Sequence, residues 1–155
     1  MSLFKFEQDF AQSLRCIPIS VRYKLDLSGV KLKLHQWMAL TTDQRQVLVE
    51  MPCQSSVESA EYRQHLISLL REYCQEEAKL FEPDPAPLWE SVDRIPDPVL
   101  SQANERQIEI PLEFWHSLPP LQRFALTKLS QSGHENRNFL PALQEFGWAS
   151  ALPTA

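Results

Sequence analysis

The densest group of side chains with catalytic or metal-binding potential is the run His134-Glu135-Asn136. A histidine beside a carboxylate can act as a general base or as a metal ligand. The same run can instead cap a helix, because asparagine accepts hydrogen bonds from free backbone N–H groups and glutamate favours the positive end of a helix dipole. Both interpretations stay open, and we rank His134, Glu135, Asn136 and the nearby Asn138 first among the candidate residues for binding a partner.

The other histidines and the cysteines do not form a ligand set. No two of the four histidines lie three or four positions apart, and no two cysteines form a C-x-x-C pair. We therefore expect reduced, mostly buried thiols in a reducing compartment, no metal site and no cofactor. Three glycines cannot build a phosphate-binding loop, and no G-x-S-x-G elbow occurs. The patterns predict no catalytic residue, and Cys53, beside Pro52, is kept as a candidate contact residue.

Proline is concentrated in the middle of the chain, where five prolines lie between Phe81 and Pro98. Pro-rich segments are extended and stiff rather than flexible. Leu88 and Trp89 lie within this segment, so we expect it to run along the surface and to be held there by the tryptophan. Trp89 either packs as an ordinary aromatic residue or faces a partner as an anchor. We rank it second among the candidate contacts, after the His134–Asn138 loop and before Cys53.

An internal repeat at an offset of 78 residues organises the remaining sequence. Residues 17–48 and 95–126 share nine identities in 32 ungapped positions, whereas unrelated segments of average composition would share about two. The identities include a tryptophan (Trp37 and Trp115), which we expect in the core, and an arginine (Arg45 and Arg123). A guanidinium can bind an anion, but a repeated position within a helix favours a structural role, such as holding carbonyls or a carboxylate.

The elements that carry these residues are predicted to be mainly helical. We expect two tandem helical repeats, about 17–75 and 95–147, packed together in a single, internally duplicated domain over 1–155. Residues 81–98 are the Pro-rich linker between them. A long helix is expected from Val57 to about Ala78. Residues 30–34 and 108–111 alternate apolar and charged residues, so we expect at most one short two-stranded β pairing, of 30–34 with 108–111.

Composition excludes several classes of function. The formal net charge is -5, so the chain lacks the broad positive field needed to bind nucleic acid without sequence preference. No stretch approaches the roughly 20 apolar residues of a membrane span, and the N-terminus lacks the apolar run of a signal peptide. We therefore expect a cytoplasmic protein that binds neither nucleic acid nor membrane.

Several blocks of the sequence carry a family resemblance, and those near the C-terminus are the most specific. The chain resembles the nitrate reductase-associated proteins of cyanobacteria and some other bacteria in the blocks Leu14–Pro18, Gly29–Leu34 with Trp37, Pro52-Cys53, Leu121–Leu126, His134–Asn136 and Asn138–Leu143. The resemblance implies a non-catalytic accessory protein that an active assimilatory nitrate reductase requires. It also implies the partner: a molybdenum and iron–sulfur enzyme that takes electrons from ferredoxin. The alternative is a small enzyme or cofactor-binding protein that uses the His134-Glu135-Asn136 loop.

Overall fold

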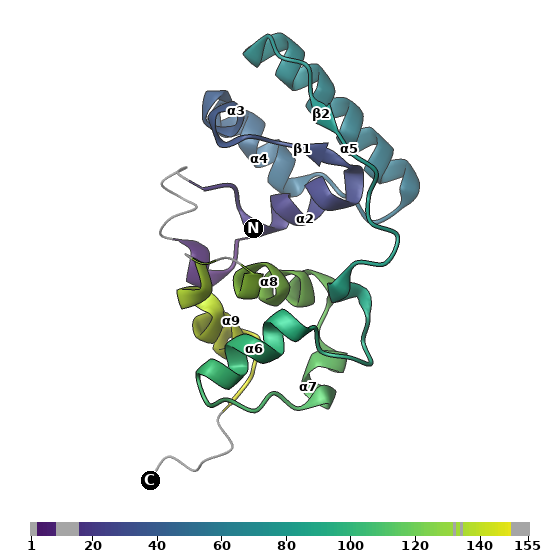
Figure 1. The fold of residues 1–155 in the computed structure, drawn as a ribbon. Coiled ribbons are helices and arrows are strands. Elements are labelled where there is room, and N and C mark those ends of the chain that lie inside the picture. The colour runs from purple at the N-terminus through teal and green to yellow at the C-terminus, as the bar shows by residue number, and fades with distance from the viewer. Residues whose placement is uncertain (1–2, 9–15, 132, 134, 150–155) are drawn as a thin grey trace. The chain divides into compact units, whose positions relative to one another are not determined.

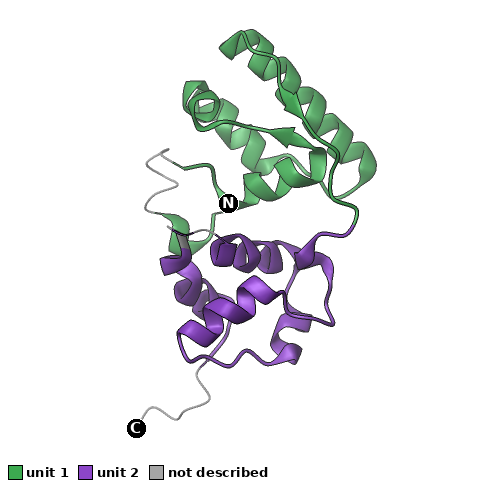
Figure 2. Ribbon diagram, viewed as in Figure 1, with its two compact units in different colours: residues 1–85 green, residues 86–155 purple. Residues whose placement is uncertain are grey.

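The chain folds into two compact units that meet in sequence between Pro85 and Ala86 (Figure 2). The structure is a computed structural model, and it describes residues 3–8, 16–131, 133 and 135–149. These residues form eight α-helices and one two-stranded sheet (Figure 1), which confirms the mainly helical prediction. None of the helices in the described ranges is both long enough and apolar enough to cross a membrane.

The first unit, residues 1–85, contains four α-helices and the sheet among its described residues. Thr41 and Ser55 cap α4 and α5 by accepting hydrogen bonds from the N–H groups of Gln44 and Glu58, and a left-handed Gly29 ends α2. In chain order its elements are η1 (Lys5–Glu7), α2 (Ile19–Ser28), β1 (Val30–Lys31), α3 (Leu34–Ala39), α4 (Thr42–Glu50), α5 (Ser56–Leu69), the π-helical turn η2 (Leu70–Cys74) and β2 (Lys79–Leu80). Its core includes the buried side chains of Val21, Trp37, Leu48, Tyr62 and Leu66.

The second unit, residues 86–155, is built from short helices around its own buried side chains. In chain order its elements are η3 (Leu88–Glu90), α6 (Asp97–Glu105), α7 (Leu112–Ser117), α8 (Pro120–Gln131), η4 (Glu135–Asn138) and α9 (Phe139–Glu145). Helix α8 lies centrally, since it packs against η3, α6, η4 and α9. Fully buried Trp115, Phe124, Leu129 and Phe139 belong to its core, as expected for the tryptophan.

The sheet pairs β1 with β2, so the predicted partner of residues 30–34 is wrong. Residues 30 and 31 face residues 80 and 79 in an antiparallel register. The strand is shorter than predicted because Lys33 is already the N-cap of α3. Residues 108–111 cannot supply a regular strand: the N–H of Ile108 bonds to the Ala103 carbonyl at the end of α6, and Pro111, the N-cap of α7, has no N–H to donate.

The helix predicted over Val57–Ala78 is also shorter in the structure. Helix α5 ends at Leu69, and η2 continues it by one turn to Cys74. Gln75 then adopts a left-handed conformation with φ of 52° and reverses the chain into β2. No glycine or proline marks this end, so the sequence carries no stop signal of the usual kind. Its apolar residues Tyr62, Leu66, Leu69 and Leu70 are buried, but Tyr73 is 47% exposed.

The element boundaries support the predicted duplication, which stays a prediction until the two units are superposed. Shifting α3 by 78 residues gives the boundaries of α7, and the residue after α2, Gly29, corresponds to Gln107 after α6. Both of these residues are left-handed, with φ of 74° and 54°. In both units the repeated arginine donates hydrogen bonds to backbone carbonyls, which is one of the two structural roles expected for it.

A buried carboxylate near the N-terminus holds the start of α2. Glu7 is fully buried, and its two carboxylate oxygens accept hydrogen bonds from the N–H groups of Phe4 (3.1 Å) and Ile19 (3.0 Å). Ile19 is the first residue of α2, whose N-cap, Pro18, makes no side-chain cap bond. Glu7 therefore caps α2 across 12 residues of chain, at the positive end of the helix dipole.

Replacing Glu7 with glutamine should lower the free energy of unfolding by about 1–2 kcal/mol, because one charge-assisted acceptor is lost. The measurement is urea unfolding followed by circular dichroism. Glu61→Gln on the exposed side of α5 is the control, and it should change stability by less than about 0.5 kcal/mol. Equal stabilities of the two variants would contradict the capping role.

Candidate functional site

Cys53, one of the three candidate regions from the sequence, lies in the core of the first unit. Its Sγ is 3.8 Å from both the Lys24 carbonyl oxygen and the Ser59 Oγ. Burial raises the pKa of the Cys53 thiol, with smaller opposing contributions from the Ser59 hydrogen bond and the Lys24 charge. The thiol is therefore neutral at physiological pH, and a partner cannot reach it while this unit is folded.

The loop ranked first is only partly within the described residues. His134 lies outside them, and Glu135 begins η4. The Asn136 carbonyl accepts a hydrogen bond from Arg106 Nη2 at 2.8 Å. Asn138 is the N-cap of α9, but its side chain makes no cap bond. Arg106 thus fixes the backbone of this loop, and the role of the His134-Glu135-Asn136 run stays a prediction.

The Pro-rich segment, in contrast, is bound closely to the second unit through Trp89. The Trp89 side chain is buried and meets the Phe124 ring edge-on, with ring centroids 5.9 Å apart. Its carbonyl accepts a hydrogen bond from Arg123 Nε at 2.8 Å. Arg123 is itself buried, and its Nη1 donates to the Leu118 carbonyl. The tryptophan therefore holds the segment from inside, and the exposed side chain beside it is Leu88.

Trp115 holds the same segment at a second point. Its Nε1 donates a hydrogen bond of 2.8 Å to the Ser91 carbonyl. The repeat indicated that Trp115 and Arg123 have structural roles, but it did not show that both bind the Pro-rich segment. No signal in the sequence connects these two donors with their acceptors in the Pro-rich segment.

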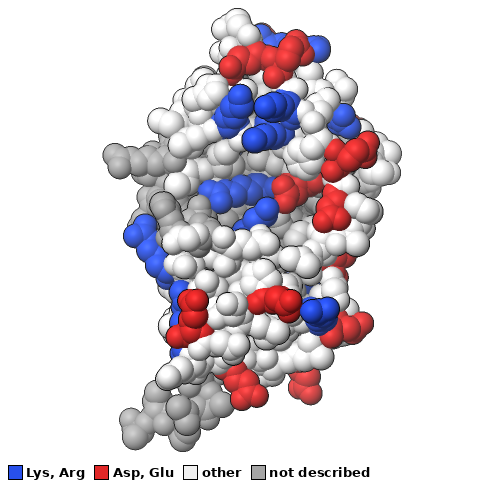
Figure 3. All heavy atoms as spheres, viewed as in Figure 1, with Lys and Arg blue, Asp and Glu red and all other residues white. Residues whose placement is uncertain are grey.

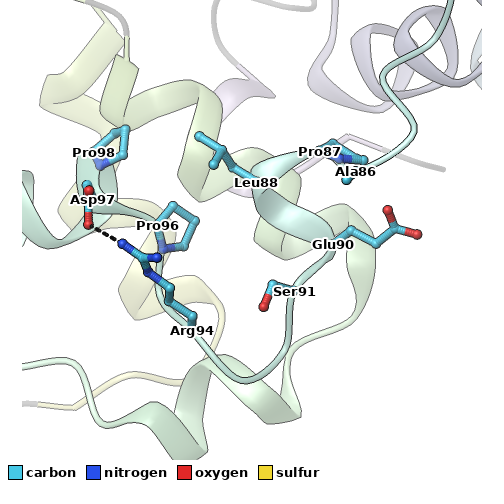
Figure 4. Close-up of a pocket in the computed structure, with 9 residues that line it drawn as sticks. All are labelled: Ala86, Pro87, Leu88, Glu90, Ser91, Arg94, Pro96, Asp97 and Pro98. Atoms are coloured by element: carbon cyan, nitrogen blue, oxygen red, sulfur yellow. Dashed lines mark hydrogen bonds and ion pairs between the residues drawn. The ribbon is translucent and has the colours of Figure 1, made fainter.

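The residues before and after these two attachment points form a hollow in the surface. The hollow has a volume of about 540 Å³ and is lined by Ala86, Pro87, Leu88, Glu90, Ser91, Arg94, Pro96, Asp97 and Pro98. Figure 4 shows Leu88, Pro96 and Pro98 around the open space, with an ion pair between Arg94 and Asp97 (3.3 Å) at its edge. The Leu88 side chain is 52% exposed. We call this feature the proline-lined hollow.

The proline-lined hollow is suited to binding an apolar side chain of another molecule. Its apolar residues are mostly prolines, whose fixed φ angles leave little conformational freedom to lose on binding. The carbonyls behind it are already bonded to Arg123 and Trp115, so the wall keeps its shape. The charged pair at the edge can orient an incoming polar group without being buried itself.

The rest of the described chain offers no comparable arrangement for chemistry. Across the described ranges, no three or more histidine, cysteine, aspartate or glutamate side chains come close enough together to hold a metal ion. The three cysteines are free thiols. Burial raises the pKa of the Cys74 thiol as well as that of Cys53.

Comparison with known proteins gives one clear result. No curated protein and no solved structure matches the chain. A family model described as "conserved nitrate reductase-associated protein" matches residues 3–146, which is nearly the whole chain and includes every residue of the proline-lined hollow. The resemblance found in the sequence is thereby confirmed, and the chain belongs to the nitrate reductase-associated protein family.

Proposed function

We propose that the chain is a non-catalytic accessory protein that binds nitrate reductase through the proline-lined hollow. The family description supports the choice of partner, and the hollow is the observation that carries the binding mode. The partner is the ferredoxin-dependent assimilatory enzyme that the resemblance implies, and the meeting place is the cytoplasm. The accessory protein promotes an active reductase by contact alone.

Leu88 is the residue through which this contact is made. Exposure of the Leu88 side chain to water is unfavourable in the free protein. Burying this side chain against a partner side chain makes a favourable contribution to the free energy of binding. The backbone that follows Leu88 is anchored by buried Trp89 and by the Ser91–Trp115 hydrogen bond. An apolar side chain on a rigid support can pack against a partner with little loss of conformational freedom on binding.

Replacing Leu88 with glutamate should weaken binding to purified nitrate reductase by at least about tenfold, because a charge would be buried against an apolar partner. Isothermal titration calorimetry measures the affinity, and reductase activity with and without the protein measures the consequence. The Leu88 side chain points into the hollow rather than into the core, so the variant should keep its fold by circular dichroism.

Val57→Glu is the matched control, because Val57 is 65% exposed at the start of α5 in the other unit. The control should bind as the wild type does. Unchanged affinity of the Leu88 variant would remove the hollow from the mechanism. Wild-type protein that neither binds the reductase nor alters its activity would end the proposal as a whole.

A further inference from the structure

A cluster of lysines lies on the β ribbon of the first unit. Along β1 and the residues after it, Val30 and Leu32 are buried while Lys31 and Lys33 are exposed, so the alternation puts both lysines on the same face. Lys79 is the cross-strand partner of Lys31 and therefore shares that face. Figure 3 shows Lys and Arg side chains gathered over this part of the unit. We call Lys31, Lys33 and Lys79 the lysine face.

The nearest carboxylates in sequence hydrogen-bond to residues other than these lysines, although the charge of Lys33 also contributes to the lowered pKa of Glu76. Glu76 accepts hydrogen bonds from His35 Nε2 (3.0 Å) and Gln36 Nε2 (3.1 Å). Glu77 accepts from Arg71 Nε at 2.9 Å and from Arg71 Nη2. Within the described part of the chain, none of the three lysines forms an ion pair closer than 4.0 Å.

The arrangement is unusual for a chain with this charge. Three of its six lysines lie on or close to one short ribbon, although the net charge is -5. Like charges directly opposite one another destabilise a sheet, so the Lys31–Lys79 pair opposes formation of the ribbon that carries it. Carboxylates of a partner placed over the ribbon would attract both lysines and so offset the repulsion between them.

Apolar side chains begin at the residue that follows the lysine face. Leu34 and Met38 are 47% and 54% exposed and lie four residues apart on α3, hence on the same side of that helix. Tyr73, also largely exposed, lies on η2, which packs against α3. Exposed apolar side chains in such a group are typical of a protein interface rather than of free surface. The charges around them are of both signs, since Lys33 precedes Leu34, Glu72 precedes Tyr73, and Glu76 bonds to His35 and Gln36 of α3.

We propose that the lysine face and the apolar group of Leu34, Met38 and Tyr73 form a second docking surface, which takes an acidic patch with an apolar centre on nitrate reductase. This inference rests on the proposed function and adds to it the chemistry of the partner surface. The lysines attract the partner and set the rate of association, whereas the proline-lined hollow sets how long the complex lasts.

The test compares the double variant Lys31→Gln/Lys79→Gln with Lys128→Gln/Arg137→Gln, which removes the same net charge from the second unit. Binding to purified nitrate reductase is followed by stopped-flow fluorescence at low and at high ionic strength. The ribbon variant should associate about tenfold more slowly at low salt and approach the wild-type rate at high salt, because exposed charges are screened. The control should associate at the wild-type rate.

The two proposals fail in different ways. If the wild type binds and both double variants associate equally fast, the lysine face has no part in docking and only this inference is overturned. If the wild type does not bind at all, the proposed function falls and this inference with it. If the ribbon variant binds normally but self-associates in size-exclusion chromatography, the lysines instead protect the sheet edges from pairing with other chains, which also overturns the inference.

Discussion

Arg123→Ala should lower the free energy of unfolding by about 3–5 kcal/mol, because it removes a buried cation that bonds two backbone carbonyls. The Trp89 and Leu118 carbonyls would lose their donors inside the core. Domains of this size are typically stable by only about 5–15 kcal/mol, so a loss of that size removes much of the margin. Because the Trp89 carbonyl anchors the Pro-rich segment, the proline-lined hollow should lose its shape in the same variant.

Denaturant unfolding monitored by tryptophan fluorescence measures the effect. Arg123→Lys keeps the charge but not the forked geometry, so it should fall between the wild type and the alanine variant. Arg94→Ala is the control: Arg94 is exposed and its ion pair with Asp97 lies at the surface, so the loss should stay below about 1 kcal/mol. Similar stabilities for Arg123→Ala and Arg94→Ala would show that the carbonyls do not depend on Arg123.

Gly29→Ala should destabilise the first unit by about 3 kcal/mol through backbone strain and a direct collision. Gly29 has a φ of 74°, and a Cβ at this position would lie 2.4 Å from the Phe81 carbonyl oxygen. The Phe81 carbonyl is part of the backbone, so it cannot move away from the added Cβ as the end of a flexible side chain could. Since the Phe81 N–H also donates to the Gly29 carbonyl at 2.9 Å, moving Phe81 away would loosen the β ribbon.

The chain supplies its own controls for this variant. Gln107, which corresponds to Gly29 in the second repeat, is not a glycine and has a φ of 54°. A residue with a side chain can therefore adopt the left-handed conformation at this position. Gly147→Ala should therefore cost only the strain of its φ, about 1 kcal/mol. Gly133→Ala, with open space around the added Cβ, should be close to neutral. Equal losses at all three glycines would contradict the collision with Phe81.

Helix boundaries that depend on local chemistry were predictable from the sequence. Gly29, the residue type that favours a left-handed cap, ends α2, and Asp97 with Pro98 begins α6. Trp37 and Trp115, the tryptophans shared by the two repeats, are buried as expected. The strand partner and the end of α5 were not predictable, because they depend on a left-handed Gln75 and on a chain reversal that no local residue type signals.

The candidate site could be predicted only in part from the sequence. The concentration of prolines around Trp89 indicated the right segment. Whether Trp89 packs in the core or faces a partner could be decided only from its burial in the structure. Trp89 is in the core and its neighbour Leu88 is outside. The hollow itself depends on Arg123 and Trp115, which lie 24 or more residues further along the chain, and no spacing rule connects such residues to a distant acceptor.

The buried indole of Trp37 has a practical consequence for spectroscopy. Trp37 is the single tryptophan of residues 1–85, and its Nε1 is buried with no hydrogen-bond acceptor in the described structure, whereas Trp115 Nε1 is bonded to a carbonyl. An indole proton without an acceptor resonates upfield of a bonded one in a proton–nitrogen correlation spectrum. Each half of the chain therefore carries an intrinsic NMR reporter with its own expected shift, and titrations of nitrogen-15-enriched protein can assign binding to one half without an attached probe.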